Sequence, residues 1–83
     1  LKHHFQPESN IRLSRLCGPL DAHLRRAEEA LGVTVSRRGA DFSIDGPPQA
    51  AKACRDLLQR IYDQADRPVY EETLELALEL KKF

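Results

Sequence analysis

The strongest limit on what this chain can fold into comes from two short segments in which apolar and polar residues alternate, with a glycine in the stretch between them. Residues 33–36 read Val-Thr-Val-Ser and residues 42–45 read Phe-Ser-Ile-Asp. A period of two residues is typical of a strand that is buried on one face only. Arg38-Gly39-Ala40 lies between the two segments, so the pattern predicts a β-hairpin.

Helical patterns lie on both sides of this hairpin. Pro19 suits the first position of a helix, because the N–H that it lacks would have no partner there. An apolar stripe follows at spacings of four, three and four residues, and Gly32 is a typical C-terminal stop. The stripe consists of Leu20, Leu24, Ala27 and Leu31. A wider apolar face follows Pro47-Pro48 and predicts a further helix; it consists of Ala50, Cys54, Leu57, Leu58, Ile61 and Ala65.

The two ends of the chain carry less regular patterns. Residues 1–5 place their odd-numbered side chains on one side of an extended segment, which predicts a short strand. Asn10 is the predicted cap of a short helix over residues 11–17. Residues 74–80 alternate leucine with glutamate or alanine as a strand would, but these residue types favour a helix, so we predict a helix over residues 71–81.

The order of these elements predicts an α+β two-layer sandwich. A three-stranded antiparallel sheet would carry the helices on one face, with an extra helix at the C-terminal end. The chain has 83 residues, which is enough for one small domain with a modest core but not for a deep catalytic cavity. We expect one domain over residues 1–66, followed by a helix or linker over residues 67–83.

This order, with a glycine turn between the first two helices, resembles the type I arrangement of KH domains. KH domains clamp the backbone of single-stranded nucleic acid at a Gly-x-x-Gly loop. The chain also resembles, over residues 5–65, the N-terminal domain of PhoH-like proteins, the phosphate-starvation family that carries a P-loop ATPase domain. The residues that carry this resemblance are Asn10-Ile11-Arg12-Leu13, Leu16-Cys17-Gly18-Pro19-Leu20-Asp21, Leu31-Gly32-Val33, Arg37-Arg38-Gly39, Phe42, Gly46, Leu57-Leu58 and Ile61-Tyr62.

The phosphate-binding motif of the family's ATPase does not occur in this chain, because no glycine here is followed by lysine. The resemblance therefore implies that ATP and magnesium bind a domain outside these 83 residues. We expect no enzyme activity, no cofactor and no catalytic residue in this chain. What the resemblance does imply is an accessory domain that assists RNA binding by the attached ATPase.

The turn Gly18-Pro19-Leu20-Asp21 is the first part of the candidate nucleic-acid site. A helix N-terminus offers free N–H groups and partial positive charge to a phosphate. Asp21 stands where the KH pattern has its second glycine. A carboxylate in the first turn of a helix compensates the helix dipole itself and repels a second anion. The turn is therefore either a structural corner that begins a helix or a weakened nucleic-acid loop.

Arginines provide the second part of the candidate site. In a KH fold the hairpin lies across the binding groove from the glycine loop, which would place Arg37, Arg38 and Gly39 opposite the turn. Arg12 and Arg15 on the first helix, with Arg25 and Arg26 on the second, would extend a basic rim. The alternative is that these are ordinary solvated side chains. The chain has a formal net charge of zero, so any basic surface must be local.

Other classes of site find little support. Cys17 and Cys54 lack metal-ligand spacing and are expected to be reduced thiols, and no cluster of histidine, cysteine and carboxylate residues indicates a metal. No apolar run reaches the length of a membrane span, and the first residues lack the apolar segment of a signal peptide. We therefore expect a cytoplasmic protein with no membrane partner.

Two functions remain open. The first is RNA binding as a KH-like accessory domain. The second is a protein-interaction or oligomerisation module, which docks on the family's ATPase domain, on a second copy of the chain or on an RNA-processing protein without touching RNA. The leucines of residues 74–80 favour the second, because on an exposed helix they would leave apolar surface.

Overall fold

Three strands form one antiparallel sheet in the computed structural model, which describes residues 1–81. The strands are β1 (Lys2–His4), β2 (Thr34–Arg38) and β3 (Asp41–Asp45), and β3 lies in the middle. The predicted hairpin is confirmed as β2 and β3, which pair with Val35 opposite Ile44. The N-terminal strand closes the other side of the sheet, with His3 opposite Phe42.

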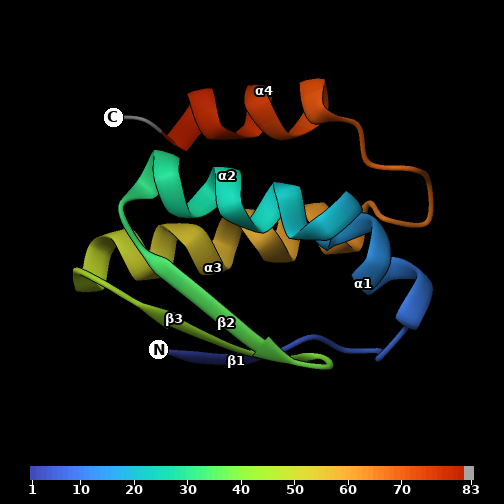
Figure 1. Cartoon of the computed structure of the whole chain (residues 1–83), viewed down its shortest axis with the longest axis horizontal. Helices are drawn as coiled ribbons and strands as arrows, with labels where there is room; N and C mark the ends of the chain where they lie inside the picture. Colours follow the sequence, from blue (N-terminus) through green and yellow to red (C-terminus); the bar gives the residue numbers. More distant parts are fainter. Residues whose placement is uncertain (82–83) are drawn as a thin grey trace.

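Helices cover one face of this sheet, as the sequence predicts. They are α1 (Asn10–Cys17), α2 (Ala22–Leu31), α3 (Pro48–Asp63) and α4 (Glu71–Lys81), with a short 3-10 turn over Pro19–Asp21 between the first two. Figure 1 shows the sheet at the bottom, α2 and α3 above it and α4 at the top. The lower face of the sheet is not covered by any helix of the described chain.

The inward residues of the strands meet the helices in one core. Phe42 and Ile44 of β3 are buried with Leu57, Leu58 and other residues of α3. Phe5 is fully buried, with its ring centroid 4.7 Å from that of Phe42 and 4.8 Å from that of Tyr62. Burial of large aromatic rings supplies much of the stabilisation available to a domain of this size. The core therefore joins the N-terminal strand to the end of α3.

The start of α1 differs by one residue from the sequence prediction. Ser9, not Asn10, is the cap: its hydroxyl oxygen accepts a hydrogen bond from the backbone N–H of Arg12 at 3.2 Å. Asn10 is the first helical residue. Both residue types are good caps, and the choice between them depends on where the chain leaves its extended conformation.

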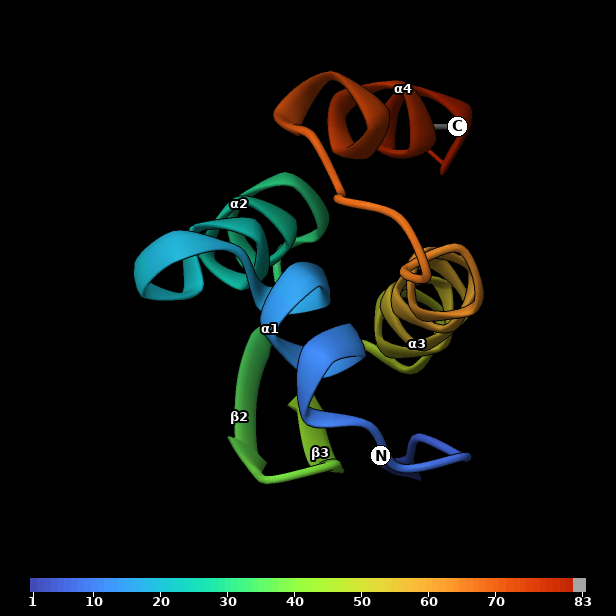
Figure 2. The ribbon, with the colours of Figure 1, turned by 90° about the vertical axis from the view of Figure 1, so that its right-hand side faces the viewer.

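The C-terminal segment is a helix, as its residue types predict, and it packs on the rest of the domain. Leu74 and Leu78 are buried, at a helical spacing of four residues. Glu75 accepts three hydrogen bonds from Arg26 of α2: from Nε to Oε2 at 2.8 Å and to Oε1 at 3.1 Å, and from Nη2 to Oε1 at 2.9 Å. Figure 2 shows α4 lying above α2 and α3 as a third layer.

Candidate nucleic-acid interface

The turn between α1 and α2 has a left-handed backbone that the sequence pattern did not indicate. Gly18 has φ 74°, and Leu20 and Asp21 have φ 53° and 58°. Left-handed residues other than glycine are uncommon, although Asp tolerates this region better than most. The helix therefore begins at Ala22, and the prediction that Pro19 is its first residue is wrong. Pro19 instead begins the 3-10 turn.

Leu20 is the clearest correction at this turn. The sequence pattern assigns it to the buried stripe of α2, but its side chain is 92% exposed. The left-handed turn rotates it out of the stripe, whereas Leu24 and Ala27 are buried as predicted. An exposed leucine thus stands at the tip of the loop that the KH resemblance assigns to nucleic acid.

Gly18 is required by its close contact with a buried histidine. A Cβ added to Gly18 would lie 2.7 Å from Cγ of the His23 ring. His23 is itself held, because its Nδ1 donates a hydrogen bond to the carbonyl oxygen of Leu16 at 3.2 Å. The ring of His23, on the first turn of α2, therefore packs against Gly18 and fixes the turn. The sequence pattern gave no indication of this role for His23.

Asp21 faces the hairpin. Its Oδ1 lies 3.8 Å from Nη2 of Arg37, and both side chains are partly exposed. The Asp21 carboxylate makes no capping hydrogen bond to α2 in the described chain. An exposed ion pair at this distance contributes little stability, on the order of 0–1 kcal/mol. It places one carboxylate and one guanidinium at the mouth of the turn, so an incoming phosphate would compete with Asp21 for Arg37.

The hairpin residues divide between the two faces of the sheet. Arg37 lies opposite the buried Phe42 and so shares the face that carries the helices, whereas Arg38 lies opposite Asp41 on the uncovered face. Gly39 has φ 61° in the hairpin turn, and its carbonyl oxygen accepts a hydrogen bond from Nη1 of Arg37 at 3.3 Å. Only Arg37 of these three predicted site residues approaches the glycine turn through a contact.

Arg12 and Arg15 hold the end of α3. Nη1 of Arg12 donates hydrogen bonds to the carbonyl oxygens of Tyr62 and Asp63, at 3.0 and 3.2 Å, and Nη1 of Arg15 donates one to that of Ala65 at 3.0 Å. These carbonyls lie at or just beyond the C-terminal end of the helix, where cationic side chains are favourable. Both arginines therefore have a structural role that their position in the sequence does not reveal.

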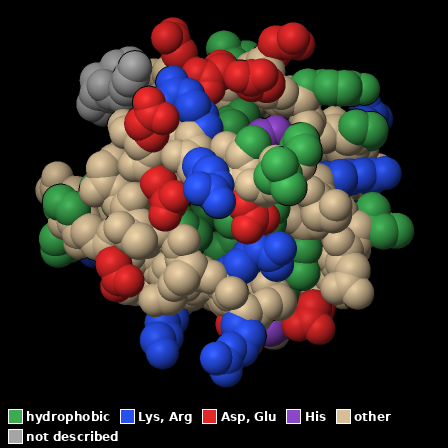
Figure 3. Space-filling model, in the orientation of Figure 1, with side chains coloured by type: hydrophobic (Ala, Val, Ile, Leu, Met, Phe, Trp, Pro, Cys, Tyr) green, Lys and Arg blue, Asp and Glu red, His purple; other side chains and the backbone are tan. Residues whose placement is uncertain are grey.

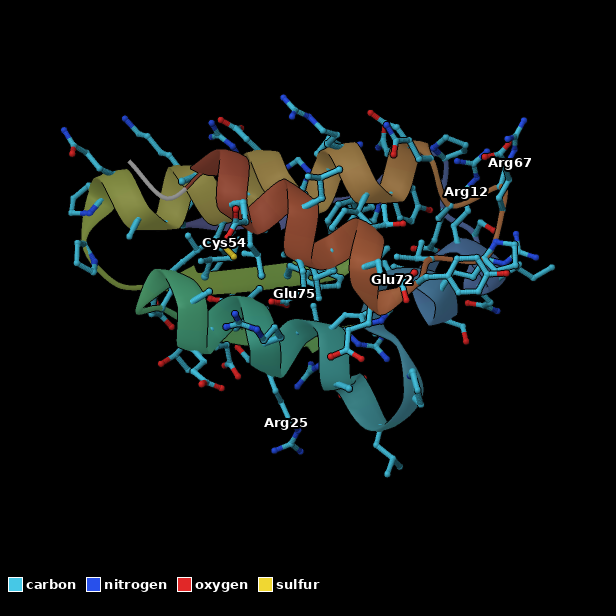
Figure 4. The ribbon with its side chains drawn as sticks, turned by 90° about the horizontal axis from the view of Figure 1, so that it is seen from above. Arg12, Arg25, Cys54, Arg67, Glu72 and Glu75 are labelled. Atoms are coloured by element: carbon cyan, nitrogen blue, oxygen red, sulfur yellow. The ribbon has the colours of Figure 1, made fainter. Side chains whose placement is uncertain are left out.

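The arginines of α2 are also separated from one another. Arg26 is paired with Glu75 of α4, and this hydrogen bond raises the pKa of the guanidinium. Arg25 points away from the body of the molecule, whereas Arg12 lies towards a different end of it (Figure 4). The four arginines predicted to form a rim thus lie in three different environments, and Arg37 is the one arginine that a described ion pair joins to the turn.

Both cysteines are buried in the core. Burial raises the pKa of the Cys17 thiol to about 11, despite the lowering effect of the nearby Arg37, and burial likewise raises the pKa of Cys54 to about 11. Neither forms a disulfide. Residues 1–81 contain no group of three or more histidine, cysteine or carboxylate side chains placed to hold a metal ion. No helix within these residues is both long and apolar enough to cross a membrane.

No protein-family model matches the chain, and no solved structure matches it significantly.

Proposed function

We propose that this chain is a KH-like accessory domain of a PhoH-like protein and that it supplies a surface for single-stranded RNA to an attached ATPase. The order of elements and the strand order β1-β3-β2 support a KH-like fold. The conformation of Asp21 carries the functional part. It stands where a KH loop has glycine, and its φ of 58° and ψ of 27° are a conformation that glycine adopts freely.

The turn and the hairpin supply complementary groups for a phosphate. The first N–H groups of α2 have no intrahelical partner and carry partial positive charge. Nη2 of Arg37 lies 3.8 Å from the Asp21 carboxylate. The position of this carboxylate therefore indicates where the phosphate of a ligand would contact Arg37. Because Asp21 already occupies this place, we expect weak binding that depends strongly on salt.

A titration of single-stranded RNA tests this proposal. The fluorescence anisotropy of a labelled 12-nucleotide RNA is followed at two salt concentrations with the parent chain, Arg37→Ala and Arg60→Ala. Arg60 is an exposed residue of α3, so its substitution removes the same charge elsewhere. Arg37→Ala should weaken binding and reduce the salt slope by about 0.7, as expected for one lost phosphate contact. Equal effects of the two substitutions, or no binding by the parent, would refute the proposed interface.

Catalysis has no place in this proposal, and ATP and magnesium are assigned to the attached domain. The same proposal places the protein in the cytoplasm, which two free thiols support.

A protein-interaction module remains the second candidate, and exposed apolar side chains favour it. Leu76 on α4 is 66% exposed and Tyr70 just before α4 is 64% exposed. Leu74 and Leu78 are consumed by the core, so the apolar surface on α4 is smaller than the sequence pattern indicates. Light scattering coupled to gel filtration distinguishes this function: a concentration-dependent dimer that Leu76→Ser dissolves, together with no RNA binding, would favour it.

A further inference from the structure

The uncovered face of the sheet carries two rows of polar side chains. The strand registers align Lys2, Ser43 and Ser36 in one row and His4, Asp41 and Arg38 in the next. Residues that are directly opposite on neighbouring strands share a face, and these rows lie on the face turned away from the buried Phe42 and Ile44. These six residues line an open hollow of about 740 Å³, together with His3, Arg37 and Phe42.

The charge of this hollow favours an anion. Lys2 and Arg38 are permanent cations at opposite corners, and the hydroxyls of Ser36 and Ser43 lie in the row of Lys2. Asp41 is the one carboxylate in the lining, and its Oδ1 is 2.6 Å from Nδ1 of His4. At that distance the imidazole N–H donates a hydrogen bond to the carboxylate, which occupies one of its oxygens.

The face of the domain shown in Figure 3 carries charged side chains of both signs. In Figure 3, Lys and Arg side chains project from the lower end of the molecule, where Figure 1 places the sheet, with an acidic side chain beside them. Several acidic side chains lie at the upper end, and basic side chains lie between the two ends. The acidic residues of α4, at that upper end, are Glu71, Glu72, Glu75 and Glu79. These four carboxylates make the α4 side of the domain unfavourable for a polyanion.

The edge strand β2 connects this hollow to the glycine turn. Arg37 and Arg38 are consecutive residues of a strand and so face opposite sides of the sheet. Nη2 of Arg37 lies 3.8 Å from Oδ1 of Asp21 in the turn, and both Arg37 and Arg38 contribute to the lining of the hollow. In the strand order β1-β3-β2, β2 has one side without a neighbouring strand in the described chain. A flexible ligand can pass around that edge and contact both arginines.

We propose that a single strand of RNA bound at the glycine turn continues around the edge of β2 and that the hollow on the uncovered face binds its phosphates through Lys2, Arg38 and the two serines. This inference rests on the proposed function and extends its site. The exposed ring of His4 adds a surface on which a base can stack. The predicted site thereby extends from the helical side of the sheet to both sides.

RNAs of two lengths separate this inference from the proposed function. A tetranucleotide is long enough for the turn alone, since a KH loop clamps about four nucleotides, whereas a decanucleotide also reaches the hollow. The double variant Lys2→Gln with Arg38→Gln is compared with Arg60→Gln with Arg67→Gln, which removes two exposed charges elsewhere. Circular dichroism verifies that each variant is folded.

The hollow variant should bind the decanucleotide about tenfold more weakly than the parent, with a salt slope reduced by about 1.4 for two lost phosphate contacts. Its affinity for the tetranucleotide should equal that of the parent, and the control variant should bind both RNAs like the parent. In NMR spectra, the amide signals of Ser36 and Ser43 should shift with the decanucleotide only.

The remaining outcomes overturn the inference in distinguishable ways. If the hollow variant binds the decanucleotide as tightly as the parent, RNA does not reach the uncovered face, although the proposed function stands. If it loses affinity for both RNAs, Lys2 and Arg38 act at the turn and there is no extended path. If the control variant loses as much affinity for the decanucleotide, the effect is general charge. If the parent binds neither RNA, the proposed function fails and this inference fails with it.

Discussion

Replacing Asp21 by glycine and by alanine tests whether the backbone at this residue is left-handed. Glycine is the more stabilising of the two at a left-handed residue, whereas alanine is the more stabilising in the first turn of a helix. Asp21 has φ 58° and ψ 27°. Alanine in this conformation costs about 1–2 kcal/mol, whereas glycine adopts it without strain. Glycine loses about 0.5–1 kcal/mol relative to alanine through its freer unfolded chain. Both substitutions remove the same carboxylate, so the loss of the contact with Arg37 cancels in the comparison.

The balance makes Asp21→Gly more stable than Asp21→Ala by about 0.75 kcal/mol, the middle of a range of about 0–1.5 kcal/mol. Urea unfolding, followed by circular dichroism, measures this difference in the free energy of unfolding, and thermal unfolding should show a difference in Tm of about 3–6 °C. At a right-handed position in the first turn, as the sequence alone indicates, alanine would be the more stable by a similar amount. An alanine variant as stable as the glycine variant, or more so, would refute the left-handed turn.

The same pair of variants bears on RNA. Both leave Arg37 without the Asp21 carboxylate, so both should bind single-stranded RNA more tightly than the parent at low salt. Asp66→Ala, which removes an exposed carboxylate between α3 and α4, is the matched control and should have a smaller effect. If the stabilities follow the expected order and RNA binding stays undetectable in all variants, the turn is purely structural.

Further predictions follow from the core and the turn. Leu24→Ala removes a side chain that is 5% exposed and should lower the free energy of unfolding by about 2–5 kcal/mol in urea; an unchanged midpoint would contradict the packing of α2. Gly18→Ala should lower the free energy of unfolding by about 2–4 kcal/mol, because φ is positive there and the new Cβ would clash with His23. The same substitution made in a His23→Ala variant should cost less, because the clash is then absent. The raised pKa values of Cys17 and Cys54, both about 11, keep the thiols protonated in the fold, so a thiol reagent at pH 8 should label them only when the domain unfolds. Above pH 9 the thiols ionise in the unfolded chain but not in the fold, so the free energy of unfolding should fall as the pH rises towards 11. Isothermal titration with ATP and magnesium should show no binding, and measurable heat would contradict our assignment of nucleotide to another domain.

The backbone geometry of the regular elements is readable from the sequence alone. Alternation in residues 33–36 and 42–45 predicts β2 and β3, and helical spacing predicts α2 and α3, because the side-chain period of each element is set by its own backbone. The open α+β sheet with helices on one face follows, since each element has one apolar face to bury.

Only the tertiary structure decides the features that depend on contacts between distant residues. The pattern of α4 fits a strand or a helix, and burial of Leu74 and Leu78 in the helical form shows how the ambiguity is resolved. Arg12 and Arg15 look like surface charges until the end of α3 is placed beside them. Such contacts join residues about 50 positions apart in the sequence. The spacing of apolar residues within one helix or strand carries no information about them.

The candidate site lies at the boundary between these two kinds of information. Gly18 and Arg37 are recognisable as site candidates in the sequence, but the left-handed Asp21 and the buried ring of His23 are not. The hydrophobic period places Leu20 in the stripe of α2, yet the turn exposes it, because the backbone must reverse direction between two helices that pack on the same core. Periodicity reports which face of an element is buried, whereas the path of the chain between elements is set by how they pack.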